Sequence, residues 1–198
     1  MRKTLAALCL LAGPALAQAP DLRPPDVLRM RALDAHLGAA LREAIAEGDP
    51  QALAVLFEAM RGAPVALDDA DPEGVWNCRT IKLGGGGVPA VAYRNFRCEI
   101  RTVTDGRWVL TKLTGSQRTT GTLAVRADGR IQYTGVGHVG TEPAVPYEDL
   151  PPKDQTPLEP NQTTADVGLF EMMSPDRARL LQPAPILESR FDILYLTR

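Results

Sequence analysis

Two hydrophobic periods divide the chain. From Pro25 onward, apolar residues such as Leu33, Leu37, Leu41 and Ile45 recur every four positions. Residues at this spacing lie on one face of an α-helix. The pattern therefore predicts a helix that presents an apolar stripe to a packing partner.

A second helix follows after a very short turn. Gly48 is suited to the end of the first helix, and Asp49-Pro50 combines an N-cap residue with a proline at the first helical position. Gly62 is suited to the end of the second helix. Because the connection is so short, we expect residues 18–66 to form an antiparallel helical hairpin.

Beyond residues 68–69 the period becomes strand-like, with turn residues at positions 105–106, 128–129 and 174–176. No helical pattern separates the strands, which favours an antiparallel meander. We predict an α+β, mainly β fold in which residues 67–198 form an eight-stranded antiparallel β-barrel, with a β-sandwich as the alternative. Such a barrel either encloses one small ligand or is filled by side chains. The candidate strands are 75–83, 92–103, 107–114, 118–126, 130–137, 167–173, 177–182 and 187–197.

Residues 140–166 fit neither period. The segment is rich in prolines and acidic residues, and Lys153 is its only basic residue. Loops of this length are uncommon in compact domains and often serve as lids or mobile segments. Two alternatives remain: the segment is a lid that packs on the barrel, or it is a loop exposed to solvent.

The N-terminus has the features of a secretory signal peptide. Arg2 and Lys3 precede an apolar run, and Ala15-Leu16-Ala17 is a small-x-small cleavage motif. The run is shorter than the roughly 20 residues that span a bilayer. We therefore predict a signal peptide at 1–17, a periplasmic location and no transmembrane segment in the mature chain.

Two cysteines remain after residue 17, and they flank four consecutive glycines. A zinc site would need more ligands at close spacing, and His36 and His138 lie in other segments. A phosphate-binding loop would need a Gly-Lys-Ser/Thr ending and a following helix, which the segment after 84–87 lacks. We predict no metal and no cofactor, and we interpret Cys78 and Cys98 as a disulfide in an oxidising compartment.

A disulfide-bridged hairpin accounts for the segment around these cysteines. With Cys78 opposite Cys98, alternation gathers apolar side chains on one face and charged side chains on the other. The glycines then lie near the hairpin tip, where unusual backbone angles are needed. The predicted pairs are Cys78–Cys98, Trp76–Ile100 and Thr80–Phe96.

Charge is unevenly distributed along the chain. Residues 75–118 carry eight basic side chains against two acidic ones, whereas 140–166 is strongly acidic. One hypothesis is that the acidic loop latches over the basic strands and competes there with an anionic ligand. The alternative is that both are ordinary solvated surfaces, since salt screens such charges over about 8–10 Å.

The candidate ligand contacts combine basic strand residues with the turn sequence GSQRTTG at 115–121. Its hydroxyl, amide and guanidinium groups together can bind a carboxylate or phosphate. The alternative is a turn followed by a polar strand start. The predicted ligand-binding residues are Arg79, Arg97, Ser116, Gln117 and Arg118.

Catalysis and nucleic-acid binding find little support. The chain has no Gly-x-Ser-x-Gly elbow, and a Ser-His-Asp set would have to use His36 or His138. Glu188, Asp192 and Asp166 would form an acid pair only if the fold brought them together. The basic strands lack interleaved aromatic residues, which argues against nucleic acid. We predict no catalytic residues and no enzyme activity.

Several segments together resemble a known family. The helical hairpin is followed by GVWNCRTIKLGG, YRNFRCEIR, LTKLTGSQRTTGTL and PAPILESRFDILYL. This order resembles an uncharacterised family of exported bacterial proteins, domain of unknown function 4893, which implies a one-domain exported protein and lends no activity. Separately, Gly74-Val75-Trp76 is similar to the opening of lipocalin-like barrels.

The sequence therefore favours a non-catalytic binding module for a small amphipathic or anionic ligand near the barrel mouth. The alternative is a protein-interaction module, such as an inhibitor of a periplasmic hydrolase, that uses the long acidic loop.

Overall fold

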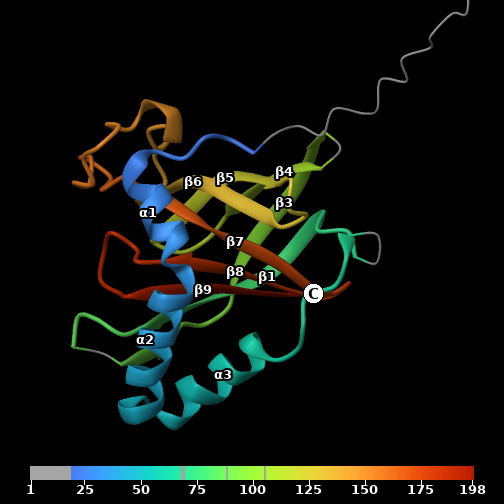
Figure 1. Cartoon of the computed structure of the whole chain (residues 1–198), viewed down its shortest axis with the longest axis vertical. Coiled ribbons are helices and arrows are strands. Elements are labelled where there is room, and N and C mark those ends of the chain that lie inside the picture. Colours follow the sequence, from blue (N-terminus) through green and yellow to red (C-terminus); the bar gives the residue numbers. More distant parts are fainter. Residues whose placement is uncertain (1–18, 68–69, 88, 105) are drawn as a thin grey trace, which may run out of the picture.

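A computed structural model describes residues 19–67, 70–87, 89–104 and 106–198. The predicted signal peptide at 1–17 and its cleavage site lie outside the described residues. N-terminal helices precede a closed antiparallel barrel, as the sequence predicted, but there are three of them rather than the two of a hairpin (Figure 1). The barrel closes because β1 pairs with β9, so the β-sandwich alternative does not apply.

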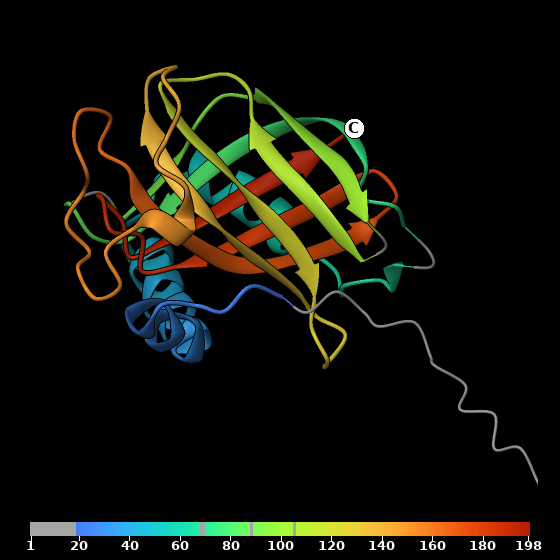
Figure 2. The ribbon, with the colours of Figure 1, turned by 90° about the horizontal axis from the view of Figure 1, so that it is seen from above.

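Eight strands form the wall of the barrel, in the order in which they occur in the chain, and each pairs antiparallel with its neighbours (Figure 2). A ninth, short strand, β2 (Ala90–Ala92), pairs only with the end of β1. The wall strands are β1 (Gly74–Leu83), β3 (Phe96–Thr104), β4 (Arg107–Lys112), β5 (Gln117–Val125), β6 (Ile131–Val139), β7 (Thr164–Ser174), β8 (Arg177–Pro183) and β9 (Phe191–Thr197).

The disulfide between Cys78 and Cys98 is confirmed, with 5.8 Å between the two Cα atoms. The predicted register is wrong by two residues, because Trp76 pairs with Cys98 and Cys78 pairs with Phe96. The cysteines are therefore diagonal neighbours. A shift of two positions leaves every side chain on its predicted face, so alternation could not distinguish the two registers.

The N-terminal helices are α1 (Pro24–Arg31), α2 (Leu33–Glu47) and α3 (Pro50–Met60). The single helix predicted before residue 48 is thus two helices, which separate at Ala32. Asp49 caps α3 as expected, since its side chain accepts hydrogen bonds from the N–H groups of Gln51 and Ala52.

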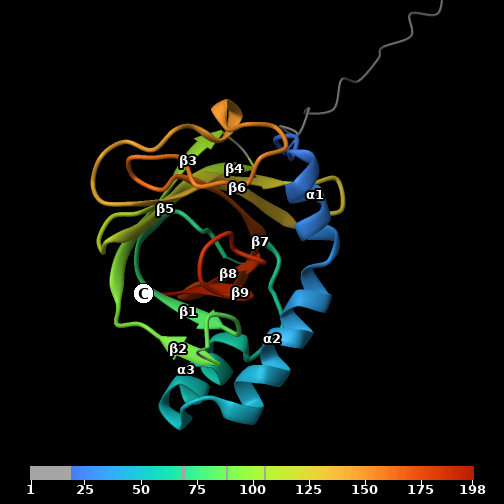
Figure 3. The same cartoon turned by 90° about the vertical axis from the view of Figure 1, so that its left-hand side faces the viewer.

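The helices pack on the outside of the barrel, along one side of the ring of strands (Figure 3). Small residues such as Ala40 and Ala44 make the contact. Ile45 and Phe57 were expected on the packing faces, but they are 57% and 56% exposed. The alanines take their place because they let the helix backbones approach the outer wall closely.

The interior of the barrel has two different halves. One end is filled by large apolar side chains, among them Trp76, Tyr133 and Phe170, each almost fully buried. At the other end, the inward positions of the same strands carry polar or charged side chains instead. The inward polar residues are Thr80, Lys82, Lys112, Gln117, Thr119, Asp166, Gln182 and Asp192.

The long loop packs on the barrel. Leu150, with Tyr147 and Leu158 beside it, packs on Val136 and Ala165 of the outer wall. The loop ends at residue 163, because Asp166, which the sequence analysis counted with it, lies in β7. Among the described residues, no ion pair joins the acidic residues at 140–163 to the basic strands.

The loop is held instead by α1. Asp26 is fully buried, and it forms ion pairs with Arg23 at 2.8 Å and Arg29 at 2.9 Å. The Tyr147 hydroxyl donates a hydrogen bond to Asp26 at 2.9 Å, and Arg23 donates to the carbonyl oxygen of Pro151 at 2.8 Å. A buried carboxylate thus connects the first helix to the loop.

Candidate functional site

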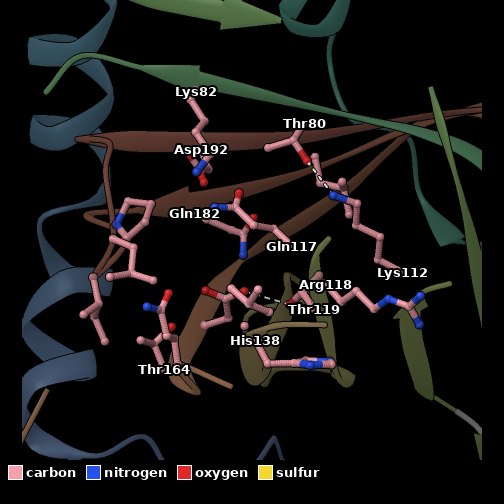
Figure 4. Close-up of a pocket in the computed structure, with 18 residues that line it drawn as sticks. Thr80, Lys82, Lys112, Gln117, Arg118, Thr119, His138, Thr164, Gln182 and Asp192 are labelled. Carbon is pink, nitrogen blue, oxygen red and sulfur yellow. Dashed lines mark hydrogen bonds between the residues drawn. The ribbon is translucent and has the colours of Figure 1, made fainter. Parts of the chain in front are cut away.

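The polar end of the barrel contains a cavity of about 80 Å³ that opens at the mouth (Figure 4). Polar side chains from β1, β4, β5, β7, β8 and β9 line its depth, and Pro185, Ile186 and Leu187 form an apolar part of the rim. A water molecule needs roughly 10–15 Å³ on this measure, so the cavity holds several waters or a small polar ligand.

Strained backbone surrounds the mouth. Gln162, Ala184 and Glu188 are the non-glycine residues with positive φ in the described part of the chain, and all lie in the two loops at the rim. Such positions cost free energy and tend to occur at functional sites.

The four glycines at 84–87 support one of these loops. A Cβ atom added to Gly86 would lie 2.9 Å from the carbonyl oxygen of Glu188. Arg190 N–H also donates to the carbonyl oxygen of Gly84 at 2.9 Å. The glycines therefore let the 184–190 loop approach β1 closely, which places Glu188 beside the mouth.

Lys82 is an ion-paired lysine. Its Nζ lies 2.5 Å from a carboxylate oxygen of Glu188, and Gln117 Nε2 donates to the other oxygen at 3.2 Å. Burial lowers the pKa of Lys82, but Asp192 and Glu188 outweigh that effect and leave the pKa raised. Lys82 therefore remains an ammonium at neutral pH.

Lys112 has a different environment. Its residue is 6% exposed, its Nζ donates to the Thr80 hydroxyl at 3.3 Å, and it lies 4.6 Å from the centroid of the Phe96 ring. Within the described ranges it makes no ion pair. Burial, with the nearby charges of Lys82 and Arg118, lowers the pKa of Lys112 from 10.5 to about 8.

Two carboxylic acids face the same cavity. Burial raises the pKa of Asp192 to about 7, despite the opposing effects of Lys82 and of a 2.5 Å hydrogen bond donated by Ser189. Burial also raises the pKa of Asp166, which accepts a 2.7 Å hydrogen bond from Thr119. The fold therefore brings together acids that sequence reasoning could not place relative to each other.

The Thr119 hydroxyl links this polar layer to the apolar half of the barrel. It lies 2.7 Å from the hydroxyl of Tyr133 and 2.7 Å from Asp166. Because a hydroxyl has one proton, Thr119 accepts from Tyr133 while it donates to Asp166. Gly135 gives the tyrosine hydroxyl room, since a Cβ atom there would lie 2.7 Å from it.

The five predicted ligand-binding residues do not form one site. Gln117 points into the cavity and Arg118 contributes to its rim, but the Arg118 guanidinium points away from the cavity (Figure 4). Ser116 is exposed in the preceding turn. Arg79 and Arg97 lie on the outer wall, where Arg79 donates to Asn95 at 3.1 Å. Arg79 and Arg97 share the outward face of the hairpin, so they lie outside the barrel and away from Gln117.

His138 lies in the outward register of β6, yet it lines the rim of the cavity, as Arg118 does. It pairs with Arg118 on the neighbouring strand, and both alternate with the inward residues Thr119 and Gly137. Burial and the charge of Arg118 lower its pKa, and Nδ1 is buried with no hydrogen-bond partner in the described structure. No group of three or more metal-ligating side chains occurs in the same described ranges.

Sequence reasoning missed the pair of lysines and the pair of aspartates as one cluster. Lys112 and Asp192 each lie at an inward position near one end of a strand, and the next inward residue along each strand, Leu110 or Leu194, is apolar. Lys82 lies at the inward end of β1. The signal available in the sequence was a charged residue at a position that alternation assigns to the inner face of the barrel. Recognising it required knowing which strand ends meet at the mouth.

Comparisons with known proteins agree with the resemblance seen in the sequence. The family described as a domain of unknown function (DUF4893) matches residues 20–196. The match spans all three helices and the barrel almost to the end of β9. No curated protein and no solved structure matches the chain. In the described residues, no helix is both long enough and apolar enough to span a membrane.

Proposed function

Because this chain belongs to the DUF4893 family, described only as a domain of unknown function, we propose a function from the cavity itself. The protein is a non-catalytic binding module that takes the anionic end of a small ligand into the barrel mouth. The observation that carries this proposal is Lys112, a buried ammonium group with no ion pair in the described structure.

The electrostatics of the cavity favour an anion. Burying a charge without a partner costs several kcal/mol, and a lowered pKa is the expected consequence. An anion bound beside Lys112 would supply the missing partner and raise that pKa again. Lys82 and Gln117 lie near enough to the mouth to add further donors, although Glu188 already accepts from both.

The size of the cavity limits the ligand. About 80 Å³ admits a group of a few non-hydrogen atoms, such as a short carboxylate. The apolar half of the barrel is filled by Trp76, Tyr133 and Phe170, so a long apolar tail has no room below the cavity. An amphipathic ligand would place its head inside and its tail against Ile186 and Leu187 at the rim.

A titration with short carboxylates, formate to butyrate, with inorganic phosphate for comparison, tests the proposal. Binding should raise the melting temperature and shift the amide signals of Thr80 and Thr119, because a ligand that binds only the folded state stabilises it. Lys112→Met should abolish the response, and Lys153→Met, in the exposed loop, should keep it. If wild type and Lys112→Met respond alike to every anion, the proposal fails.

Native mass spectrometry of protein purified from its own compartment provides a second test. An extra mass that survives purification and is lost on refolding supports a bound ligand. A bare polypeptide mass, with no response to any anion, would instead favour the protein-interaction module.

We also propose that the protein is exported to the periplasm. The basic residues, apolar run and Ala-Leu-Ala motif at 1–17 support this location, as does the Cys78–Cys98 disulfide. Mass spectrometry of the periplasmic fraction should find a chain that begins at Gln18. A chain that retains residues 1–17 and stays in the cytoplasm would contradict it.

A further inference from the structure

We propose that Lys112 is a nucleophile that captures a small carbonyl compound bearing a carboxylate, such as an α-keto acid, as a reversible Schiff base. The inference rests on the proposed function, because it assigns a substrate class to the same cavity. It adds a covalent step that simple anion binding does not require.

The position of the amine carries the argument. Lys112 is the last residue of β4, and its side chain extends along the cavity wall toward Thr80 (Figure 4). The Thr80 hydroxyl at 3.3 Å and the Phe96 ring at 4.6 Å hold the ammonium group in place. In the described structure no carboxylate lies within ion-pair distance to keep it protonated.

The surroundings increase the fraction of Lys112 that is a free amine. Groups from four strands act on Lys112: burial, Lys82 and Arg118 lower its pKa, whereas Asp192 and Asp166 raise it, and the result is about 8. At pH 7 about a tenth of such lysines are neutral, whereas a lysine with the ordinary pKa of 10.5 is neutral about 300 times less often. Desolvation and a neighbouring cation activate lysines for Schiff-base chemistry in this way.

The other cavity lysine has the complementary property. Lys82 is held by Glu188 at 2.5 Å and its pKa is raised, so it remains charged. Its charge therefore adds to the attraction for the carboxylate of the substrate at the mouth, while the neutral form of Lys112 attacks the carbonyl carbon. Two lysines in one cavity thus have different roles because only one has a carboxylate partner.

The chemical step balances without an oxidant. The Lys112 nitrogen forms a bond to the carbonyl carbon, the nitrogen loses a proton and the oxygen gains one, which yields a carbinolamine. The carbinolamine hydroxyl then gains a proton and leaves as water, and a C=N bond remains. Asp192, whose pKa is raised to about 7 mainly by burial, faces the same cavity and can donate and accept these protons near neutral pH.

Reductive trapping tests the inference with an internal comparison. The described chain contains three lysines, Lys82, Lys112 and Lys153, in three different environments. Folded protein is incubated at pH 7 with glyoxylate and sodium cyanoborohydride, which reduces the imine to a stable secondary amine. Peptide mapping then gives the extent of modification at each lysine. We expect Lys112 to be modified at least tenfold faster than exposed Lys153.

Acetaldehyde, which has a carbonyl group but no carboxylate, is the matched probe. The ratio of Lys112 to Lys153 modification should be higher with glyoxylate than with acetaldehyde. It should fall to about one for both probes in denaturant. Equal modification of the two lysines in the folded protein would overturn the inference.

Two controls separate this inference from the proposed function. Lys112→Arg keeps the positive charge and removes the nucleophile, so it should prevent trapping and retain the response to acetate. If the wild type binds acetate but shows no preference for Lys112 in trapping, the covalent step is wrong and the anion site stands. If neither acetate binding nor trapping occurs, both proposals fail. Lys82→Arg, which keeps the paired cation, should still be trapped at Lys112.

Discussion

The replacement Lys112→Met should stabilise the protein at neutral pH, and the gain should disappear in alkali. Methionine has a similar length and fills the space beside Phe96 without a charge. At pH 7 the wild type keeps an ammonium group in a site where its pKa falls from 10.5 to about 8. Each pKa unit corresponds to about 1.4 kcal/mol, so the charged lysine costs up to about 3 kcal/mol.

The direction with pH follows from linkage. Between pH 8 and pH 10.5 the unfolded chain still binds the proton at Lys112, whereas the folded protein has released it. The wild-type free energy of unfolding therefore rises with pH in this window relative to that of Lys112→Met. Below pH 8 both states are protonated, and the difference between the two proteins stays constant.

Urea unfolding of both proteins at pH 6, 7, 8, 9 and 10 measures this difference. We expect Lys112→Met to be about 1–3 kcal/mol more stable up to pH 8, and to lose this advantage toward pH 10. Because Asp192 and Asp166 are present in both proteins, much of their own titration cancels in the difference. Lys153→Met, at an exposed position, should show no such pH dependence.

Two results would refute the reasoning. A Lys112→Met protein that is less stable at pH 7 would mean that the contacts with Thr80 and Phe96 outweigh the cost of the charge. A difference that does not change between pH 7 and pH 10 would mean that Lys112 keeps an ordinary pKa. A variant that is more stable and also fails to bind anions would show that the lysine is retained for function at a cost in stability.

Three further predictions concern the frame around the cavity. Replacing Cys78 and Cys98 by alanine should lower the free energy of unfolding in urea by about 3 kcal/mol. The disulfide joins residues 20 positions apart in sequence and so restricts the unfolded chain. An unchanged urea midpoint would contradict this prediction. Asp26→Asn should lower the free energy of unfolding by about 3–5 kcal/mol, because Arg23 and Arg29 lose their ion-pair partner. It should also increase proteolysis within 140–163. Unchanged proteolysis there would show that the loop does not depend on α1. Gly135→Ala should lower the free energy of unfolding by more than about 2 kcal/mol, because the new Cβ atom would lie 2.3 Å from a backbone oxygen. Gly38→Ala, at an open helical position, should instead raise it by about 0.5–1 kcal/mol. Thermal unfolding measures both changes, and the same sign for both would refute the argument.

The local pattern was sufficient for much of the fold. Alternation located the wall strands and the faces of the hairpin around Cys78 and Cys98, and Asp49-Pro50 marked the start of α3. Alternation failed where two strand registers give the same pattern of inward and outward residues. The hairpin register is ambiguous by two residues, because both registers put Trp76 on the inner face.

The candidate site also shows which features local pattern can predict and which it cannot. The sequence predicted Gln117 as a ligand contact, and Gln117 lines the cavity, but the prediction grouped it with Arg79 and Arg97, which lie on the outer wall. Charge along the chain could not distinguish an inward lysine from an outward arginine. That distinction depends on the pleat and on the register of each strand.

The sequence by itself determined the elements: helices, an antiparallel set of strands, a disulfide and a family. These are properties of neighbouring residues, since periodicity, caps and turns act over a few positions. Only the tertiary structure decided that the barrel closes, that its apolar half is filled, and that Lys82, Lys112, Asp166 and Asp192 share one cavity. The physical reason is that β1 and β9, which are far apart in sequence, pair and close the barrel, so that the inward side chains of all the wall strands face one another. The burial that shifts the pKa values of these residues exists only once the strands have come together.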